Sequence, residues 1–241
     1  MILEKTIFKI GGSIIENPMY LKNTISQFKQ LVQQNLINNI IIIPGGASYA
    51  NFIRTLDKEL KIGNTMAHWM AIYAMNYNGK KIVRQYPFIN LTENIEELLT
   101  IDHSITLFLP FKYLKIKDPL PHNWDVTSDS ITLYIAHELE LSQCFLIKDV
   151  DGILNQDNKL IQHLTTSSFI QMKESGKLAK IDFNERAIKK SKPIDKYSLE
   201  IIDKYNMSCI LLNGALNTLR ILQYFTSTKE TEKIFTKISF S

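Results

Sequence analysis

The stretch Ile7-Phe8-Lys9-Ile10-Gly11-Gly12-Ser13 opens the fold: an apolar run leads into two glycines and a serine. The apolar residues predict a short buried strand, and the glycines predict a turn where the backbone can approach a ligand closely. Backbone amides at such a turn attract anions, and Lys9 adds a positive charge at the end of the strand. This stretch therefore predicts a phosphate-binding turn, although a tight strand-to-helix turn with an exposed lysine fits the same residues.

A second unit of the same kind follows about thirty residues later. The β-branched run at residues 40–43 predicts another buried strand, and it ends in Pro44-Gly45-Gly46-Ala47-Ser48. Between the two units, apolar residues recur at helical spacing: Leu21, Ile25, Phe28, Leu31, Val32 and Leu36. Ligands in open α/β sheets bind beyond the carboxyl ends of the strands, so both glycine turns are expected at one edge of a sheet.

The rest of the chain alternates between strand-like and helix-like segments. Short strands are predicted at residues 81–83, 106–109, 145–147 and 209–212, a hairpin at 153–161, and helices at 67–78 and 199–202. This alternation predicts an α/β fold, a three-layer α/β/α sandwich with a mostly parallel central sheet. We expect a single domain over residues 1–241, with the break at 118–121 separating an N-lobe (1–118) from a C-lobe (119–241).

Composition excludes several classes of function. The formal charge of +4 is mild and the basic residues are dispersed, so no nucleic-acid partner is expected. Cys144 and Cys209 lie far apart inside apolar runs, which indicates reduced core residues, and the five histidines lack zinc-binding spacing. No apolar run reaches membrane length and no signal sequence is evident, so we expect no membrane partner, no protein-bound metal and a cytoplasmic location.

A polar loop at residues 122–130 precedes a helical pattern. Thr127, Ser128 or Asp129 would cap that helix. The carboxylates of Asp125 and Asp129 could also hold Mg²⁺ or position lysines beside a phosphate. His68, within the predicted helix at 67–78, is interpreted as a packed core or interface histidine.

The two glycine turns and two later motifs follow one another along the chain in a recognisable order. Lys9 to Ser13, Pro44-Gly45-Gly46, Thr127-Ser128-Asp129 and Asp149-Val150-Asp151-Gly152 together resemble the amino acid kinase family, which includes acetylglutamate, aspartate, uridylate and isopentenyl phosphate kinases. Lys192-Pro193-Ile194-Asp195 also resembles a segment of the uridylate kinases. Residues 120–130, with residues 67–71 and Arg54, resemble the archaeal-type branch that includes the aminomethylfuran-methyl phosphate kinase of methanofuran biosynthesis.

This resemblance implies an ATP- and Mg²⁺-dependent kinase that phosphorylates a phosphate or carboxylate group of a small molecule, with a methanofuran-precursor phosphate as the nearest candidate. It implies three catalytic residues: Lys9, Asp129 and Lys192. It implies phosphate and ATP binding by Gly11, Gly12, Ser13, Lys148, Asp149, Asp151 and Gly152. It implies acceptor binding by Gly45, Gly46, Ala47, Arg54, Trp124, Asp125, Thr127 and Ser128. It also implies a homodimer or higher homo-oligomer, with the helix around residues 67–75 as the candidate contact.

The sequence departs from the family at two places. Ala47 stands where the second glycine turn usually has a third glycine, and Asn51 stands where the branch tends to show an acidic residue. Lys177 or Lys180 could replace Lys192 as the second catalytic lysine. A non-catalytic nucleotide- or oxyanion-binding protein of the same fold, serving storage or sensing, is the rival function. If Asp129 acts in catalysis, Asp129→Asn is expected to cut turnover severely and leave the fold intact, because asparagine still caps a helix.

Overall fold

The structure, a computed structural model, describes residues 3–179, 193–215 and 217–241, so Lys180 and Lys192 lie outside the described residues. Eight strands form one sheet: β1 (Leu3–Ile10), β2 (Ile37–Pro44), β3 (Asn90–Thr92), β4 (Ser104–Phe108), β5 (Gln143–Lys148), β8 (His163–Thr165), β9 (Ser208–Asn213) and β10 (Thr236–Ser239). Their order is β3-β4-β2-β1-β5-β9-β10-β8, and every pair is parallel except β9 with β10. The predicted α/β fold with a mostly parallel sheet is confirmed.

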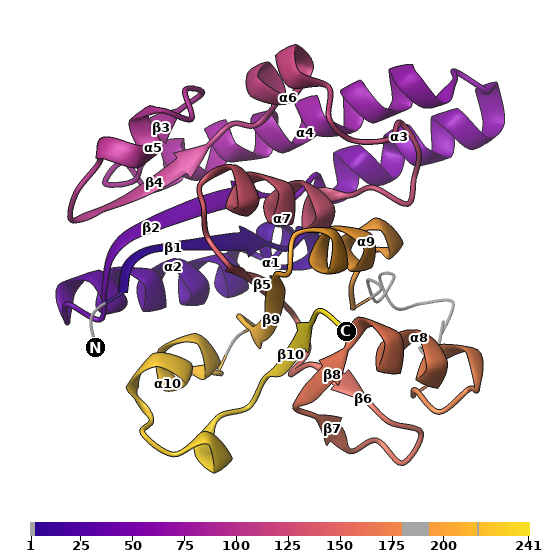
Figure 1. The fold of residues 1–241 in the computed structure, drawn as a ribbon. Helices are drawn as coiled ribbons and strands as arrows, with labels where there is room; N and C mark the ends of the chain where they lie inside the picture. The colour runs from indigo at the N-terminus through magenta and orange to yellow at the C-terminus, as the bar shows by residue number, and fades with distance from the viewer. Residues whose placement is uncertain (1–2, 180–192, 216) are drawn as a thin grey trace.

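Helices cover both faces of this sheet (Figure 1). The described helices are α1 (Gly12–Glu16), α2 (Pro18–Gln33), α3 (Ala47–Leu60), α4 (Asn64–Gln85), α5 (Glu97–Thr100), α6 (Phe111–Lys117), α7 (Ser128–Glu138), α8 (Thr166–Glu174), α9 (Lys196–Lys204), α10 (Arg220–Thr226) and the 3₁₀ helix η1 (Glu230–Glu232). Helices α6 and α7 lie on one side of the sheet, and α2 and α10 lie on the other. The long helix α4 packs in both cores, through Ile72 and Met75 on the α7 side and through Ile82 on the α2 side. The hairpin of α3 and α4 extends past the edge of the sheet.

Alternation along the central strands decides which face each side chain meets. In β1, Ile7 packs in the core under α7, whereas Phe8 packs in the core under α2. In β5, Leu146 lies in the core under α7, and Ile147 lies in the core under α2. Successive side chains of a strand point to opposite faces, so Lys9 and Lys148 both face α7.

One predicted strand is wrong. Residues 81–83 form the last turns of α4, which runs through Gly79 to Gln85 and is longer than the predicted helix at 67–78. A side chain at Gly79 would put its Cβ 2.6 Å from methyl groups of Leu107 and Leu109, so the glycine lets α4 pack closely on the sheet. A short apolar run does not by its periodicity distinguish strand from helix, which explains the error.

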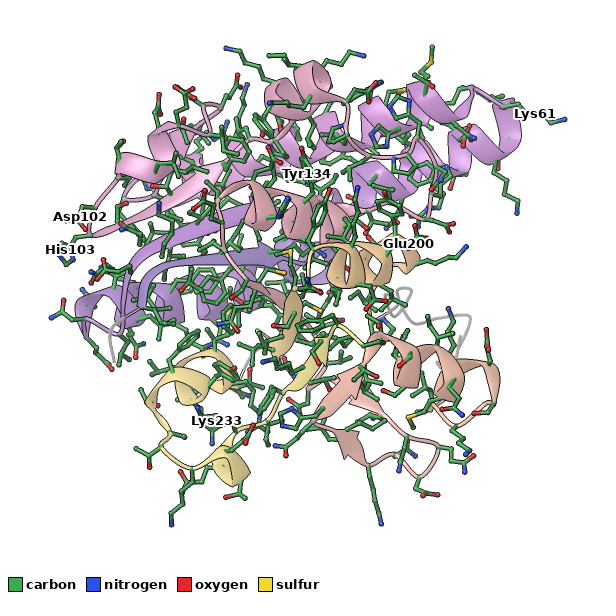
Figure 2. All side chains as sticks on the ribbon, viewed as in Figure 1. Lys61, Asp102, His103, Tyr134, Glu200 and Lys233 are labelled. Atoms are coloured by element: carbon green, nitrogen blue, oxygen red, sulfur yellow. The ribbon has the colours of Figure 1, made fainter. Side chains whose placement is uncertain are left out.

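The remaining predicted elements are present. The predicted strands at 106–109, 145–147 and 209–212 correspond to β4, β5 and β9, and the predicted hairpin is β6 (Ile153–Leu154) paired with β7 (Leu160–Ile161). The predicted break at 118–121 lies between α6 and α7, and strands from both sides of it join the one sheet. In Figure 2, Lys61 marks the tip of the α3–α4 hairpin, and Tyr134 of α7 lies in the interior.

Within the described ranges, no helix combines the length and apolar character that crossing a membrane requires.

Candidate active site

Asp129 lies between two buried lysines at the carboxyl ends of adjacent parallel strands. Its Oδ1 is 2.8 Å from Nζ of Lys9 and its Oδ2 is 2.7 Å from Nζ of Lys148. The three residues are only 3–5% exposed. Lys9 pairs with Leu146 in the register of β1 and β5, so Lys148 lies two residues further along on the same face. Helix α7 packs across both strands and brings Asp129, near its start, to this point.

The charges in this triad depend on one another. Burial alone would raise the pKa of Asp129, but Lys148 and Lys9 outweigh it and hold that pKa at about 2. Burial lowers the pKa of Lys9 to about 8, although Asp129 opposes the shift. Two positive charges therefore share one negative charge, which leaves the triad itself with one excess positive charge. Such a site favours an anionic ligand.

The two glycine turns touch each other above the ends of β1 and β2. A Cβ placed on Gly12 would lie 2.9 Å from Cα of Ala47. The amide of Gly11 donates to the carbonyl of Ile147 at 2.9 Å, and the amide of Gly45 donates to the carbonyl of Ile10 at 2.9 Å. These two amides connect neighbouring strands and are therefore not free to bind a phosphate. Only the amides that follow them in each turn could do so.

A cavity of about 690 Å³ opens beside the triad. Of the residues predicted for the site, those lining it are Lys9, Gly12, Ser13, Gly46, Ala47, Arg54, Trp124, Asp125, Thr127, Ser128, Asp129 and Lys148. The guanidinium carbon of Arg54 lies 4.5 Å from the centre of the Trp124 ring, and the indole nitrogen of Trp124 donates to Asp57 at 2.7 Å. The sequence therefore brings most of its predicted phosphate and acceptor residues to one cavity.

Several predicted residues lie outside the cavity lining. Gly11 and Gly45 take part in the strand connections above, and Asp149, Asp151 and Gly152 follow β5. Asp151 accepts hydrogen bonds from Asn213 at 3.1 Å and from Arg220 at 3.2 Å. Lys177, a candidate for the second catalytic lysine, is exposed after α8 and does not line the cavity. Lys180 and Lys192, which are also candidates for that role, lie outside the described residues.

The polar loop is fixed by Thr127 and Asp195. Thr127 is the N-cap of α7, and its hydroxyl accepts from the amide of Asp129 at 3.3 Å. Among the three predicted caps, Thr127 is therefore the one that caps. The carboxylate of Asp129 contacts the two lysines and does not cap α7, so an asparagine at this position would not support the fold as a cap.

Sequence reasoning missed one wall of the cavity. Helix α4 supplies the residues Asn64, His68, Ala71, Ile72 and Met75, whose spacing of three or four residues places them along one stripe of the helix. The same spacing is visible in the sequence, but an apolar stripe predicts core packing as readily as a cavity wall. Glu16, Asn51, Asn123, Asp195 and Lys196 also line the cavity. The interpretation of His68 as a packed core or interface histidine agrees with its 7% exposure but did not place it at the cavity.

Comparison with known proteins now gives the class of this chain. Residues 4–213 match the Amino acid kinase family. The chain belongs to that family; it is a kinase, a phosphotransferase that uses ATP, as the resemblance of its motifs implied. It is 30% identical over 210 residues, 86% of this chain and 87% of the relative, to the (5-(aminomethyl)furan-3-yl)methyl phosphate kinase of Methanocaldococcus jannaschii.

Solved structures share the fold at low sequence identity. The UMP kinase of Ureaplasma parvum matches with a TM-score of 0.66 at 17% identity, over 99% of this chain and 97% of that one. The uridylate kinase of Archaeoglobus fulgidus matches with a TM-score of 0.66 at 15% identity, over 98% and 100% of the two chains. The aspartate kinase of Synechocystis matches with a TM-score of 0.61 at 10% identity, over 98% of this chain and 40% of that one.

Proposed function

We propose that this kinase transfers the γ-phosphoryl group of ATP to the phosphate of a small aminomethylfuran-type acceptor, the substrate class named for its 30% identical relative. The observation that carries the proposal is the buried triad, in which Asp129 holds Lys9 and Lys148 at 2.8 and 2.7 Å beside the cavity. Phosphoryl transfer needs positioning and neutralisation of charge more than covalent chemistry, and the triad supplies both.

Each residue of the triad has a distinct part in this proposal. An oxygen of the acceptor phosphate attacks the γ-phosphorus, and the bond from that phosphorus to the β–γ bridging oxygen breaks to release ADP. Lys9 and Lys148 neutralise the charge on the transferred group. Asp129 accepts no proton and keeps both ammonium groups aimed at that group. The turn amides of Gly12 and Ser13, which line the cavity, supply further donors.

Magnesium enters this proposal with the nucleotide. Mg²⁺ is usually held by phosphate oxygens, waters and one or two carboxylates, and the described residues contain no cluster of three acidic, thiol or imidazole side chains. Asp149, directly after Lys148 at the end of β5, fits the single carboxylate that such an ion needs. Asp129 does not fit, because both of its oxygens contact lysines. The ion would neutralise phosphate charge.

Different segments of the chain hold the two substrates in this proposal. Residues of α3 and α4 form one wall of the cavity and would hold the acceptor, together with Trp124 and Asp125. Asp149, Asp151 and Gly152 follow β5, outside the cavity lining, and would hold the nucleotide. Lys192 stays a prediction as a further ligand of the ATP phosphates.

A panel of acceptors tests the proposal. The purified chain is mixed with ATP and Mg²⁺ and with aminomethylfuran-methyl phosphate, UMP or isopentenyl phosphate, and ADP and the diphosphate product are measured. We expect transfer to the furan phosphate and at most slow transfer to the other two. Binding of ATP without transfer to any acceptor would favour the rival storage or sensing function. Fast transfer to UMP alone would show that the proposed acceptor is wrong, while the chain would still be a kinase of a phosphate group.

We also propose that two copies associate through α3 and α4. The aromatic and methionine side chains Tyr49, Met70, Tyr73 and Tyr77 are 38–58% exposed around an apolar groove of about 470 Å³. Within the predicted contact at residues 67–75, Ala67, Ile72 and Met75 are instead buried against their own chain. The contact therefore uses the outer stripe of α4, through Met70 and Tyr73, because contiguous exposed apolar side chains mark association surfaces.

A further inference from the structure

His68 is a buried polar residue with no part in the triad. It is 7% exposed and lines the same cavity as those three residues. In the part of the chain that the structure describes, its ring nitrogens make no hydrogen bond, whereas both ring nitrogens of its neighbour His122 do. The nitrogens of His68 are not fully enclosed by the described residues, so they are open to the cavity that His68 lines and available to a ligand.

The ring of His68 is held firmly in place. It stacks on His122 at 4.4 Å between ring centres and meets the edge of Trp69 at 4.9 Å. His122 is itself anchored by hydrogen bonds to Thr65 at 3.0 Å and to Asp118 at 2.7 Å. A ring fixed on one face and at one edge presents its nitrogens in a constant direction, which is what a specific hydrogen bond to a ligand requires.

Helix α4 sets how far His68 lies from the phosphate end of the cavity. The side chain of Asn78 donates to the carbonyl of Gly45 at 2.9 Å, and a Cβ on Gly46 would lie 3.5 Å from the carbonyl oxygen of Ala71. The later turns of α4 therefore lie at the second glycine turn. His68 lies one turn earlier than Ala71, about 4.5 Å further along the helix axis and away from that turn.

We propose that His68 is a specificity-determining residue that accepts a hydrogen bond from the ammonium group of the acceptor. This assignment rests on the proposed acceptor, which carries a phosphate at one end and an aminomethyl group at the other. The positive triad attracts the phosphate, so the ammonium group lies toward the opposite end of the cavity, along α4. Ile72 and Met75, between the two ends, offer an apolar surface to the furan ring.

The charge state of His68 agrees with this role. Burial lowers the pKa of His68 to about 4, and His122 and Lys115 add to the shift while Asp118 opposes it. The ring is therefore neutral at physiological pH and retains one nitrogen with a free electron pair, which can accept from an ammonium group. Asp125, the exposed acid on the facing loop, already pairs with Lys196 at 3.4 Å.

Two acceptors that differ in one group test the assignment. The ratio of kcat/KM is measured for aminomethylfuran-methyl phosphate against the analogue in which a methyl replaces the aminomethyl group. In the unmodified enzyme we expect a ratio of about tenfold or more, the usual value of a hydrogen bond to a charged group. His68→Phe keeps a ring on His122 and should bring the ratio near one, and His68→Gln should retain part of it. His103→Gln, at an exposed histidine, is the matched control.

The KM for ATP should stay the same in all variants, which separates a local effect from a damaged fold. An unchanged ratio in His68→Phe would overturn the assignment and leave the proposed acceptor intact. An equal loss of kcat/KM for both acceptors in both His68 variants would also overturn it, because a purely structural residue would act that way. No transfer to either furan phosphate by the unmodified enzyme would overturn the proposed acceptor and the assignment together.

Discussion

Thr127 and Asp195, which lie 68 residues apart in the chain, meet at the start of two helices. Asp195 Oδ2 accepts from the backbone amide of Thr127 at 2.9 Å and from its hydroxyl at 2.6 Å. The same carboxylate accepts from Ser130 in α7 and from the amide of Ser198 in α9, whose N-cap is Asp195 itself. One buried carboxylate therefore fixes the first turn of α7, and with it the position of Asp129.

Asp195→Asn should destabilise the protein and disturb the triad. The variant replaces one acceptor oxygen by an amide nitrogen that meets donors, so we expect a loss of about 3 kcal/mol in the free energy of unfolding. Turnover should fall as well, because Asp129 loses its support. Chemical denaturation and ATP turnover measure the two effects. Asp157→Asn, in the exposed turn between β6 and β7, should change neither quantity.

Asp129→Asn should cost stability as well as turnover. It leaves two lysine side chains buried without an opposite charge, and breaking a buried pair in this way costs about 3–5 kcal/mol. Without the carboxylate, Lys9 and Lys148 should no longer be held in position, which should lower kcat by about a hundredfold. Asp125→Asn is the control for stability, because Asp125 is 52% exposed and its surface pair contributes little. A fully stable Asp129→Asn protein with normal kcat would remove the triad from the site.

Lys9 should give the reaction an alkaline limit. Its pKa is lowered by burial to about 8, so its ammonium form predominates below pH 8 and is lost as the pH rises above that value. If the charged form binds the phosphates, kcat/KM for ATP should be flat from pH 6.5 to 7.5 and fall about tenfold per pH unit above pH 8. Asp129→Asn removes the charge that raises this pKa, so the limit should move to lower pH. A flat profile up to pH 9.5 would contradict this role of Lys9.

The fold could be predicted well from the sequence because continuous apolar runs mark the buried strands. Runs such as residues 40–43 are apolar on both faces, and each glycine turn follows directly, so strand, turn and layer order agreed. The short polar-flanked strands β3, β8 and β10 have no such run and were missed. Residues 81–83 were misassigned because a short apolar run is compatible with a helix end as well as a strand.

The site was harder to predict because it depends on register. Lys148 could be assigned to the phosphate region from its motif. Its contact with Asp129, however, depends on the pairing of β1 with β5 and on how α7 packs across these strands. The connection of Asp195 to Thr127 joins residues far apart in the chain, which no local pattern reveals. The role of His68 could not be predicted either, because the spacing of residues along a helix does not show whether they face a core or a cavity.

Tyr73→Glu should separate the proposed dimer. Tyr73 is 58% exposed on the outer stripe of α4, so a charge there would lie in the contact without disturbing the monomer core. Sedimentation at micromolar concentration should show a dimer for the unmodified chain and a monomer for the variant. Leu219→Glu is a matched control, because Leu219 is also 58% exposed and lies just before α10. A monomer for the unmodified chain would contradict the proposal.

Ala47→Gly should stabilise the protein, because Ala47 holds a backbone conformation that favours glycine. Its φ is +52°, in the left-handed region, which costs a residue with a Cβ about 1–2 kcal/mol. Glycine removes this strain and costs about 0.5–1 kcal/mol in chain entropy, so we expect a net gain of about 0.5–1 kcal/mol in the free energy of unfolding. Ala50→Gly, in the regular part of α3, should destabilise by about 1 kcal/mol. Equal losses in both variants, measured by chemical denaturation, would show that the turn at Ala47 is not strained.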